Sequence, residues 1–225
     1  MIMTNKSITT IYVVRHGQTE FNDTLDFSLR DKDGELGACL SELGQAQAKI
    51  LAQKLKSVNF AAIFSSDLAR AKETAEIVAL ERTIAVKTTE AIRERDIVGY
   101  AIKQGHKNMD EVEKWLKKEL EELDEEAKMN YKHSPDMESP NECATRLLTF
   151  IREAAVAYAG QTIMIVCHSN IMRCLLNHLG YAKFDELPRK SIENTAYFVL
   201  ESDGVDFFVK ETEGIQKIQG VIRPF

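Results

Sequence analysis

Arg15 and His16 are two adjacent side chains suited to binding and attacking an anionic group. Histidine can act as a covalent nucleophile, and a neighbouring guanidinium can grip phosphate oxygens through two parallel hydrogen bonds. The pair directly follows the apolar run of residues 10–14, which is typical of a buried β-strand. Because ligands bind at the carboxyl ends of strands in open α/β sheets, we expect both side chains at such an edge.

A second histidine follows another apolar run in the same way. Residues 162–167 are almost continuously apolar, as expected for a strand covered on both faces, and His168 comes directly after them. A third strand, beginning at Ile63, precedes a helix that we expect to start at a serine or aspartate, with Arg70 in its first turn. Since the helix dipole disfavours a cation there, Arg70 is expected to face a bound anion.

These motifs, in this order, resemble those of the histidine phosphatase superfamily, the group that includes the cofactor-dependent phosphoglycerate mutases. The stretches that carry the resemblance are residues 15–19, 21–22, 40–48, 65–75, 92–94, 138–139 and 166–168. They spread across most of the chain, and only the segment from about Val98 to Met137 lies outside the match. The resemblance implies a phosphoglycerate mutase-like fold.

The order of the predicted elements supports the same architecture. Strands and helices alternate, which predicts a three-layer α/β/α fold with a mainly parallel central sheet. Ser41 is expected to cap one helix, and Ser139-Pro140-Asn141-Glu142 has the form of a capping box at the start of another. Residues 197–200 and 205–209 flank Ser202-Asp203-Gly204 as a terminal hairpin. We expect a single domain over residues 1–225.

The segment outside the match predicts a separate feature. Its apolar residues recur at helical spacing and predict an amphipathic helix with a solvated charged face, namely Val112, Trp115, Leu116, Leu120 and Leu123. Because the segment follows Glu94, residues 98–137 are expected to form a helical lid insertion over the active site. Candidates for setting substrate choice are Lys103, His106, Lys107 and Lys114, although His106 and His133 are more simply explained as incidental surface histidines.

The resemblance implies hydrolysis of a phosphate monoester in two steps. His16 would attack phosphorus as a neutral imidazole and form a phosphohistidine. Arg15 and Arg70 would bind the non-bridging oxygens, and His168, held charged by the phosphate, would donate a further hydrogen bond. Glu94 would protonate the leaving oxygen and then take a proton from the attacking water, which requires a raised pKa.

Five further residues are expected to support or contact the phosphate: Gly17, Gln18, Thr19, Asn22 and Ser169. Asn22 resembles the family's polar contact to phosphate, although it could instead cap a turn. Gln18 and Thr19 would form a supporting loop, and Gly17 would let the backbone turn sharply behind the nucleophile. Ser169 stands where many members have glycine, so its hydroxyl is expected either to cap the following helix or to touch phosphate.

The acid and the reaction outcome each have alternatives. Glu90 is the alternative acid and Asp96 lies nearby, but the pattern Ile92-Arg93-Glu94 followed by Gly99 favours Glu94. The segment after Glu94 lacks the arginine- and tyrosine-rich stretch that holds the carboxylate in glycerate mutases, which favours a phosphatase over a mutase-type phosphotransferase. A catalytically silent phospholigand-binding module is disfavoured because all five catalytic residue types are present. Glu20 and Arg173 are expected to be structural or rim residues.

Composition limits the partners. The formal net charge of −6 argues against nucleic acid or an anionic membrane as a bulk partner. No apolar stretch approaches the roughly 20 residues needed to span a bilayer, and the first residues lack an apolar core of signal-peptide length. The four cysteines have no metal-like or paired spacing, which favours reduced thiols. We therefore expect a cytoplasmic enzyme without metal or cofactor, with a small-molecule phosphate ester as substrate and a homodimer as one possible assembly.

Overall fold

A six-stranded sheet in the order β3-β2-β4-β1-β5-β6 forms the centre of the fold. The computed structural model describes residues 7–24, 27, 39–80 and 82–218. The strands are β1 (Thr9–Arg15), β2 (Ala62–Ser66), β3 (Val86–Thr89), β4 (Thr162–Cys167), β5 (Ile192–Ser202) and β6 (Phe207–Ile215). Strands β1 to β4 run parallel, whereas β5 pairs antiparallel with both β1 and β6. The expectation of a mainly parallel sheet is confirmed.

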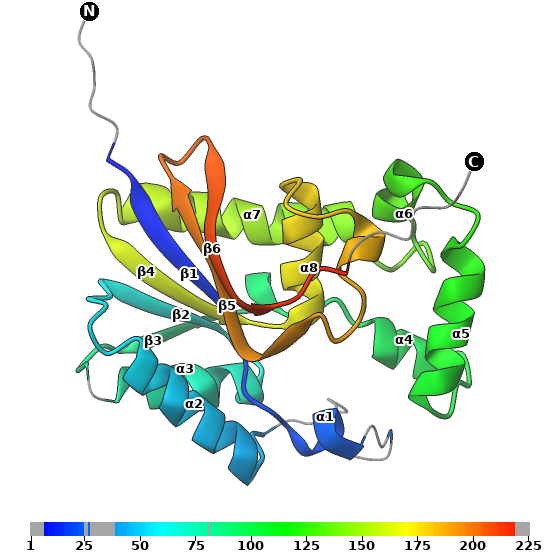
Figure 1. Ribbon diagram of the computed structural model, residues 1–225, viewed down its shortest axis with the longest axis horizontal. Helices are drawn as coiled ribbons and strands as arrows, with labels where there is room; N and C mark the ends of the chain where they lie inside the picture. The colour runs from blue at the N-terminus through cyan, green and yellow to red at the C-terminus, as the bar shows by residue number, and fades with distance from the viewer. Residues whose placement is uncertain (1–6, 25–26, 28–38, 81, 219–225) are drawn as a thin grey trace, which may run out of the picture.

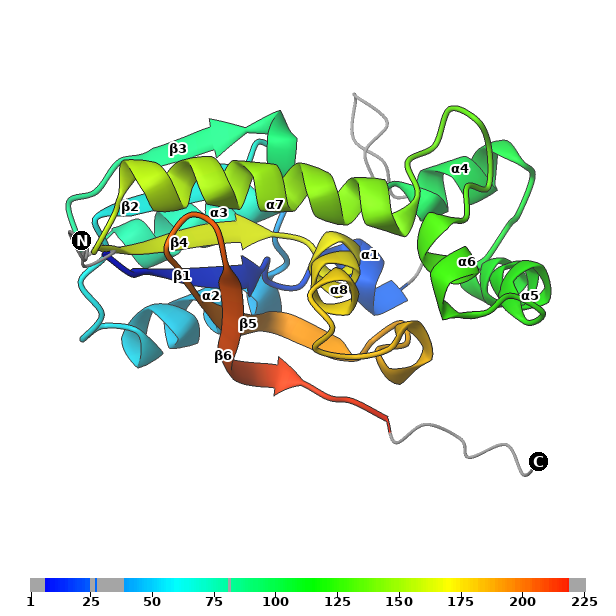
Figure 2. The ribbon, with the colours of Figure 1, turned by 90° about the horizontal axis from the view of Figure 1, so that it is seen from above.

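Helices cover both faces of this sheet (Figure 2). Helices α7 (Pro140–Ala157) and α8 (Ser169–His178) lie on one face, and α2 (Glu42–Lys54) and α3 (Ala69–Ala79) lie on the other. Alternate residues of β4 enter the two layers: Ile163 and Ile165 pack in the α7–α8 core, and Met164 and Val166 pack in the α2–α3 core. This two-sided burial explains the continuous apolar run in β4 and confirms the three-layer fold.

Local sequence signals locate most helix starts correctly. The Ser41 hydroxyl accepts a hydrogen bond from the Gly44 N–H at 3.1 Å at the start of α2, and Ser139 and Glu142 form the predicted capping box of α7. The terminal hairpin is confirmed, with strands longer than predicted. The serine or aspartate cap expected before Arg70 is wrong, because Leu68 is the N-cap of α3 and makes no side-chain capping bond.

The predicted helical insertion forms three helices beyond the carboxyl ends of β1 and β4 (Figures 1 and 2). They are α4 (Ile97–Lys103), α5 (Met109–Leu120) and α6 (Glu125–Asn130). The predicted amphipathic helix ends at Leu120, so Leu123 is not part of it. Asp124 starts the next helix by accepting a hydrogen bond from the Ala127 N–H at 2.8 Å, which explains the break.

His133 is not an incidental surface histidine as expected. Its side chain is only 2% exposed, and its Nδ1 lies 2.7 Å from Oε2 of Glu119. The ring packs against Trp115, with 4.7 Å between centroids, and His106 stacks on the same tryptophan at 5.1 Å. Both histidines therefore help to hold the helical insertion together. The remaining short elements are α1 (Glu20–Thr24) and the 3-10 turns η1 (Glu90–Ile92) and η2 (Phe184–Glu186).

Candidate active site

The two predicted histidines meet at the carboxyl ends of β1 and β4. The His16 N–H donates to the carbonyl oxygen of Cys167 at 3.0 Å, which extends the pairing of the two strands to the site. The His16 and His168 rings lie 5.2 Å apart between centroids, and both residues are buried. The parallel register of neighbouring strands therefore brings together two residues that are 152 positions apart in the chain (168 − 16).

His16 is neutral and has one ring nitrogen with a free lone pair. Its Nδ1 lies 2.7 Å from the Gly17 carbonyl oxygen, and because a carbonyl only accepts, Nδ1 must carry the proton. The lone pair is then on Nε2. Burial, followed by the positive charges of Arg70 and Arg15, holds the pKa of His16 well below its usual value. The imidazole is therefore unprotonated at neutral pH, as nucleophilic attack requires.

Two guanidinium groups accompany the histidines. Arg15 donates from Nη1 to the Ile192 carbonyl oxygen at 2.6 Å, and Arg70 is 8% exposed in the first turn of α3. Burial is the main reason that the pKa of Arg15 falls to about 10, so the group still carries its charge at neutral pH. Both cations lower the pKa values of His16 and His168. The site therefore has a local positive potential in a protein of net charge −6.

His168 has no hydrogen-bond partner on either ring nitrogen among the residues that the structure describes. Burial and then the charge of Arg70 hold its pKa well below the usual histidine value. The ring is consequently neutral without a bound anion. The charged His168 expected from the sequence requires the negative charge of a phosphate group at the site.

The two buried histidines should make the fold acid-sensitive. In the unfolded chain, His16 and His168 take up protons below about pH 6.5, whereas in the folded chain they stay neutral. The unfolded state binds more protons in this window, so stability falls as pH drops below about 6.5, by up to about 1.4 kcal/mol per pH unit for each histidine. Urea unfolding at pH 7.5 and 5.5 should show a smaller acid-induced loss for His168→Gln than for the wild-type protein. Equal losses would contradict the assigned neutral state.

Glu94 is held by the amino end of α8. Its Oε2 accepts from the Asn170 N–H at 3.0 Å, and its Oε1 accepts from the Ile171 N–H and the Arg95 N–H, both at 2.9 Å. The carboxylate thus caps α8 from a distant part of the chain. Burial raises the pKa of Glu94 and outweighs these hydrogen bonds, which act in the opposite direction.

The other two acid candidates lie outside this arrangement. Glu90 is exposed, and its carboxylate is 3.6 Å from Nη2 of Arg93. Asp96 caps α4 by accepting from the Gly99 N–H at 2.7 Å. Of the three carboxylates, Glu94 is the one that the structure places against the helix that follows His168.

Ser169 is not the cap of α8. The helix begins at Ser169 itself, with His168 as the N-cap residue, and the N–H groups of the next two residues donate to Glu94. The capping alternative is therefore wrong, and contact of its hydroxyl with a phosphate stays a prediction.

The loop after His16 supports the site through the backbone. Gln18 donates its N–H to Oε1 of Gln47 at 2.9 Å, which joins the loop to α2. Thr19 and Asn22 bond reciprocally, each side chain accepting from the other's backbone N–H at 3.2 Å. Asn22 therefore does cap a turn through its side-chain oxygen, which leaves its amide NH₂ as the group that could donate to an anion.

Gly17 is required for close packing and not for a sharp turn. Its φ is not positive, unlike that of the turn glycines elsewhere in the chain. A Cβ at Gly17 would lie 2.6 Å from the carbonyl oxygen of Gly44, and a Cβ at Gly44 would lie 2.0 Å from the carbonyl oxygen of Gln18. The two glycines allow α2 to approach the loop that follows His16.

Three supporting residues were not predicted. Thr74 accepts the Gly17 N–H at 3.0 Å, and Asn194 donates its side-chain amide to the His16 carbonyl oxygen at 3.2 Å. Arg146 donates to the carbonyl oxygens of Ala91 and Arg93, at 2.8 and 3.1 Å, and so holds the segment that leads to Glu94. Thr74 lies within the matching stretch of residues 65–75, and Arg146 follows the Glu138-Ser139 match, with Glu138 as its bidentate partner.

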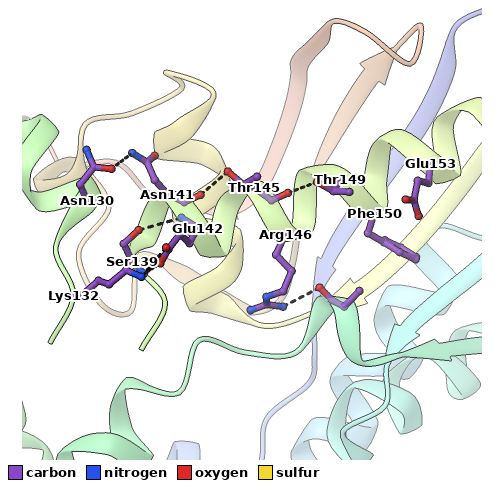
Figure 3. A pocket seen from close by; sticks show the side chains of 11 residues that line it. Asn130, Lys132, Ser139, Asn141, Glu142, Thr145, Arg146, Thr149, Phe150 and Glu153 are labelled. Carbon is purple, nitrogen blue, oxygen red and sulfur yellow. Dashed lines mark hydrogen bonds and ion pairs between the residues drawn. The ribbon is translucent and has the colours of Figure 1, made fainter. Parts of the chain in front are cut away.

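Arg146 also borders a groove of about 690 Å³ on the outer side of α7 (Figure 3). Its other lining residues include Lys132 and Glu142, whose side chains form an ion pair. None of the five proposed catalytic residues is among the described residues that line it. This groove is therefore separate from the histidine site.

Among the described residues, no three histidine, cysteine, aspartate or glutamate side chains gather as a possible metal site. Within the same residues, every helix is too short or too polar to cross a membrane.

Comparison with known proteins supports the sequence resemblance. Residues 11–213 match the profile of the family described as histidine phosphatase superfamily (branch 1). The probable phosphoglycerate mutase GpmB of Photorhabdus laumondii is 29% identical over 166 residues, which cover 74% of this chain and 72% of that protein.

Solved structures share the fold. Bacillus stearothermophilus YhfR superposes with a TM-score of 0.67 at 27% identity, over 92% of this chain and 97% of that one. A mycobacterial glucosyl-3-phosphoglycerate phosphatase gives 0.65 at 20% identity, over 93% and 100% of the two chains. The second likeness, at this low identity, concerns the fold alone.

Proposed function

Since the chain belongs to the histidine phosphatase superfamily (branch 1), we propose that it hydrolyses a phosphate monoester through a phosphohistidine on His16. Nε2 of His16 attacks phosphorus, and the bond to the ester oxygen breaks as Glu94 gives that oxygen a proton. Water then attacks phosphorus and gives a proton to Glu94, the N–P bond breaks, and inorganic phosphate leaves. His16 returns to its neutral form, and no metal ion or cofactor takes part.

One observation carries this proposal: a buried, neutral His16 lies beside His168 and within reach of the charges of Arg70, which is buried, and Arg15, which is half-buried. The arginines and His168 are suited to bind the equatorial oxygens, where negative charge develops during in-line displacement. Ser169 and the amide of Asn22 are the additional contacts that we propose for the phosphate, while Gln18, Thr19 and Gly17 support the loop.

A mutase is the second candidate, since a probable phosphoglycerate mutase is among the relatives. In a mutase, the phosphohistidine transfers its phosphate to another hydroxyl and not to water. The helical insertion of this chain lacks the arginine- and tyrosine-rich stretch of the glycerate mutases, and its candidate lysines, Lys103, Lys107 and Lys114, are exposed. The proposal therefore favours water as the acceptor.

We also propose that the chain forms one domain in which residues 98–137 act as a lid. Phe21 of α1 packs against the apolar cluster of the insertion, which includes Met109 and Val112. Across the insertion, Glu113 of α5 accepts from Arg189 of the loop before β5 at 2.6 Å. These contacts join the insertion to both sides of the site. Cys143, Cys167 and Cys174 are buried and form no disulfide, which supports a cytoplasmic location.

Phosphate release tests the proposed reaction. The wild-type protein, assayed in chelator against sugar, nucleotide, glycerate and aryl phosphates, is expected to release phosphate without a bisphosphate primer. Release that disappears in chelator would contradict the metal-free scheme. Interconversion of 2- and 3-phosphoglycerate that depends on a bisphosphate primer and proceeds faster than phosphate release would favour the mutase.

A further inference from the structure

Three arginines besides Arg15 and Arg70 gather beside Glu94. Arg95 follows Glu94 directly, Arg173 lies on α8, and Arg189 lies in the loop before β5. They are close enough to act on one another: burial is the main cause of the lowered pKa of Arg173, Cys174 and Glu94 act to raise it, and the charges of Arg95 and Arg189 act to lower it. The charge of Arg189 also lowers the pKa of Arg15. Arg189 is therefore near enough to Arg15 and to Arg173 for its charge to act on both.

Two of these arginines have buried nitrogens without hydrogen-bond partners. Arg95 is 5% exposed, and its Nε donates to the Glu138 carbonyl oxygen at 2.9 Å, but its Nη2 has no partner among the described residues. Nε of Arg173 is also buried, and it has no hydrogen-bond partner among the described residues. A buried charged donor without a hydrogen-bond partner costs more free energy than a buried neutral donor without one. Buried charged groups therefore normally have a partner.

These unpartnered atoms are concentrated at the site. Seven buried side-chain nitrogen or oxygen atoms lack a partner among the described residues, and four belong to His168, Arg15 and Arg173. Nη2 of Arg95, which is next to Glu94, and the Ser191 hydroxyl, which is next to the Arg15 acceptor Ile192, are two more. Only the seventh, Nε of Arg82, lies elsewhere in the described chain.

The nearby carboxylates are engaged with other groups. Glu94 accepts three backbone N–H groups, Glu138 pairs with Arg146, and Glu113 pairs with Arg189. No ion pair joins Arg95 or Arg173 to a carboxylate within the described residues. The described residues therefore provide no paired carboxylate for the buried Arg95 or for Arg173, whose Nε is buried.

From this arrangement we propose that Arg95 and Arg173, with Arg189 at the rim, form a second anion-binding site beside the one for the ester phosphate. It would take a carboxylate or a second phosphate of the substrate, and this assignment rests on the proposed phosphatase function. A neutral hydroxyl could satisfy a donor but would not offset the repulsion between the guanidinium groups, whereas an anion does both. The structural or rim role expected for Arg173 from the sequence is replaced by this binding role.

Matched pairs of substrates test the second site. O-phosphoserine and O-phosphoethanolamine differ only by a carboxylate, and 1,3-propanediol bisphosphate and propyl phosphate differ by a second phosphate. In one of the two pairs, we expect kcat/KM to be at least 10-fold higher for the compound with the additional anionic group, called the doubly anionic member. The pair that shows this preference indicates whether the second site binds a carboxylate or a phosphate. Equal kcat/KM values within both pairs would overturn the proposal.

The Arg173→Met variant connects this preference to the residue. It should reduce the preference by about 10- to 100-fold, mainly through KM, because a charge-assisted hydrogen bond in a buried site is lost. Arg82→Met is the matched control, because Arg82 also has a buried Nε without a partner but donates to Val78 and Leu55, away from the site. It should leave the preference unchanged. An undiminished preference in Arg173→Met would overturn the assignment; if that variant does not fold, the same comparison is made with Arg173→Lys.

Binding to His16→Ala protein separates this proposal from the proposed function, because it requires no turnover. Calorimetry should show at least 10-fold tighter binding of the doubly anionic member of the preferred pair. Suppose that the wild-type protein hydrolyses no ester, that the difference in affinity is still measured in His16→Ala, and that the double variant His16→Ala/Arg173→Met lacks this difference. The second site then stands and the phosphatase assignment fails. If esters are hydrolysed without any preference, the phosphatase assignment stands and the second site fails.

Discussion

Replacement of His16 by alanine is expected to lower kcat for every phosphate ester by about 10⁴-fold or more, because no other group can form the covalent intermediate. In the structure, Nε2 of His16 is the nitrogen left with a lone pair, since Nδ1 donates to Gly17. Phosphate release measures the loss directly. In addition, wild-type protein quenched during turnover of a ³²P-labelled ester should carry acid-labile, base-stable label, and His16→Ala should carry none.

His178→Ala is the matched control for this experiment. His178 lies at the end of α8, is exposed, and has its Nδ1 3.1 Å from Oδ1 of Asn141. Its loss should leave turnover and labelling unchanged. Thermal unfolding should show that both variants are folded. Retention of more than a tenth of wild-type turnover in a folded His16→Ala protein would exclude His16 as the nucleophile.

Glu94→Gln should separate substrates by their leaving groups. For alkyl phosphates, whose leaving oxygen is strongly basic, kcat should fall by about 10²- to 10⁴-fold, the usual contribution of general acid catalysis. For activated aryl phosphates the loss should stay below about 10-fold. The pH profile provides a second readout: burial raises the pKa of Glu94, so wild-type activity on alkyl esters should decline as pH rises past that value. The variant should lack this decline.

Glu90→Gln is the control that decides between the two acid candidates. Glu90 is exposed, so its replacement should affect neither substrate class. Glu94→Gln should also be less stable by roughly 1–3 kcal/mol, because an amide nitrogen cannot accept the N–H groups at the start of α8. If alkyl and aryl esters lose activity equally in Glu94→Gln, this carboxyl is not the acid.

Much of the fold could be predicted because its signals are local. The apolar run of β4 reports burial on both faces, and the capping box at Ser139 reports a helix start, without knowledge of any distant residue. The amphipathic pattern of the insertion predicts a helix that continues to Leu123, but the helix ends at Leu120. Apolar spacing alone does not show that Asp124 caps a new helix.

The supporting contacts could not be predicted because each joins distant parts of the chain. Gly17 meets Gly44, Asn194 meets the His16 carbonyl oxygen, and Glu94 caps a helix that begins 75 residues later (169 − 94). His133 has no local feature that marks it as buried, because its burial depends on Trp115 and Glu119 of α5.

The sequence by itself determined the family, the α/β architecture and the residues at the strand ends, since residue type and order along the chain carry that information. The tertiary structure decided which nitrogen of His16 is free, that Glu94 and not Glu90 accepts the N–H groups at the start of α8, and that Arg173 has an unpartnered nitrogen. The physical reason is that tautomer, pKa and hydrogen-bond satisfaction depend on burial and on neighbours in space. Those neighbours are set only when the sheet and helices pack together.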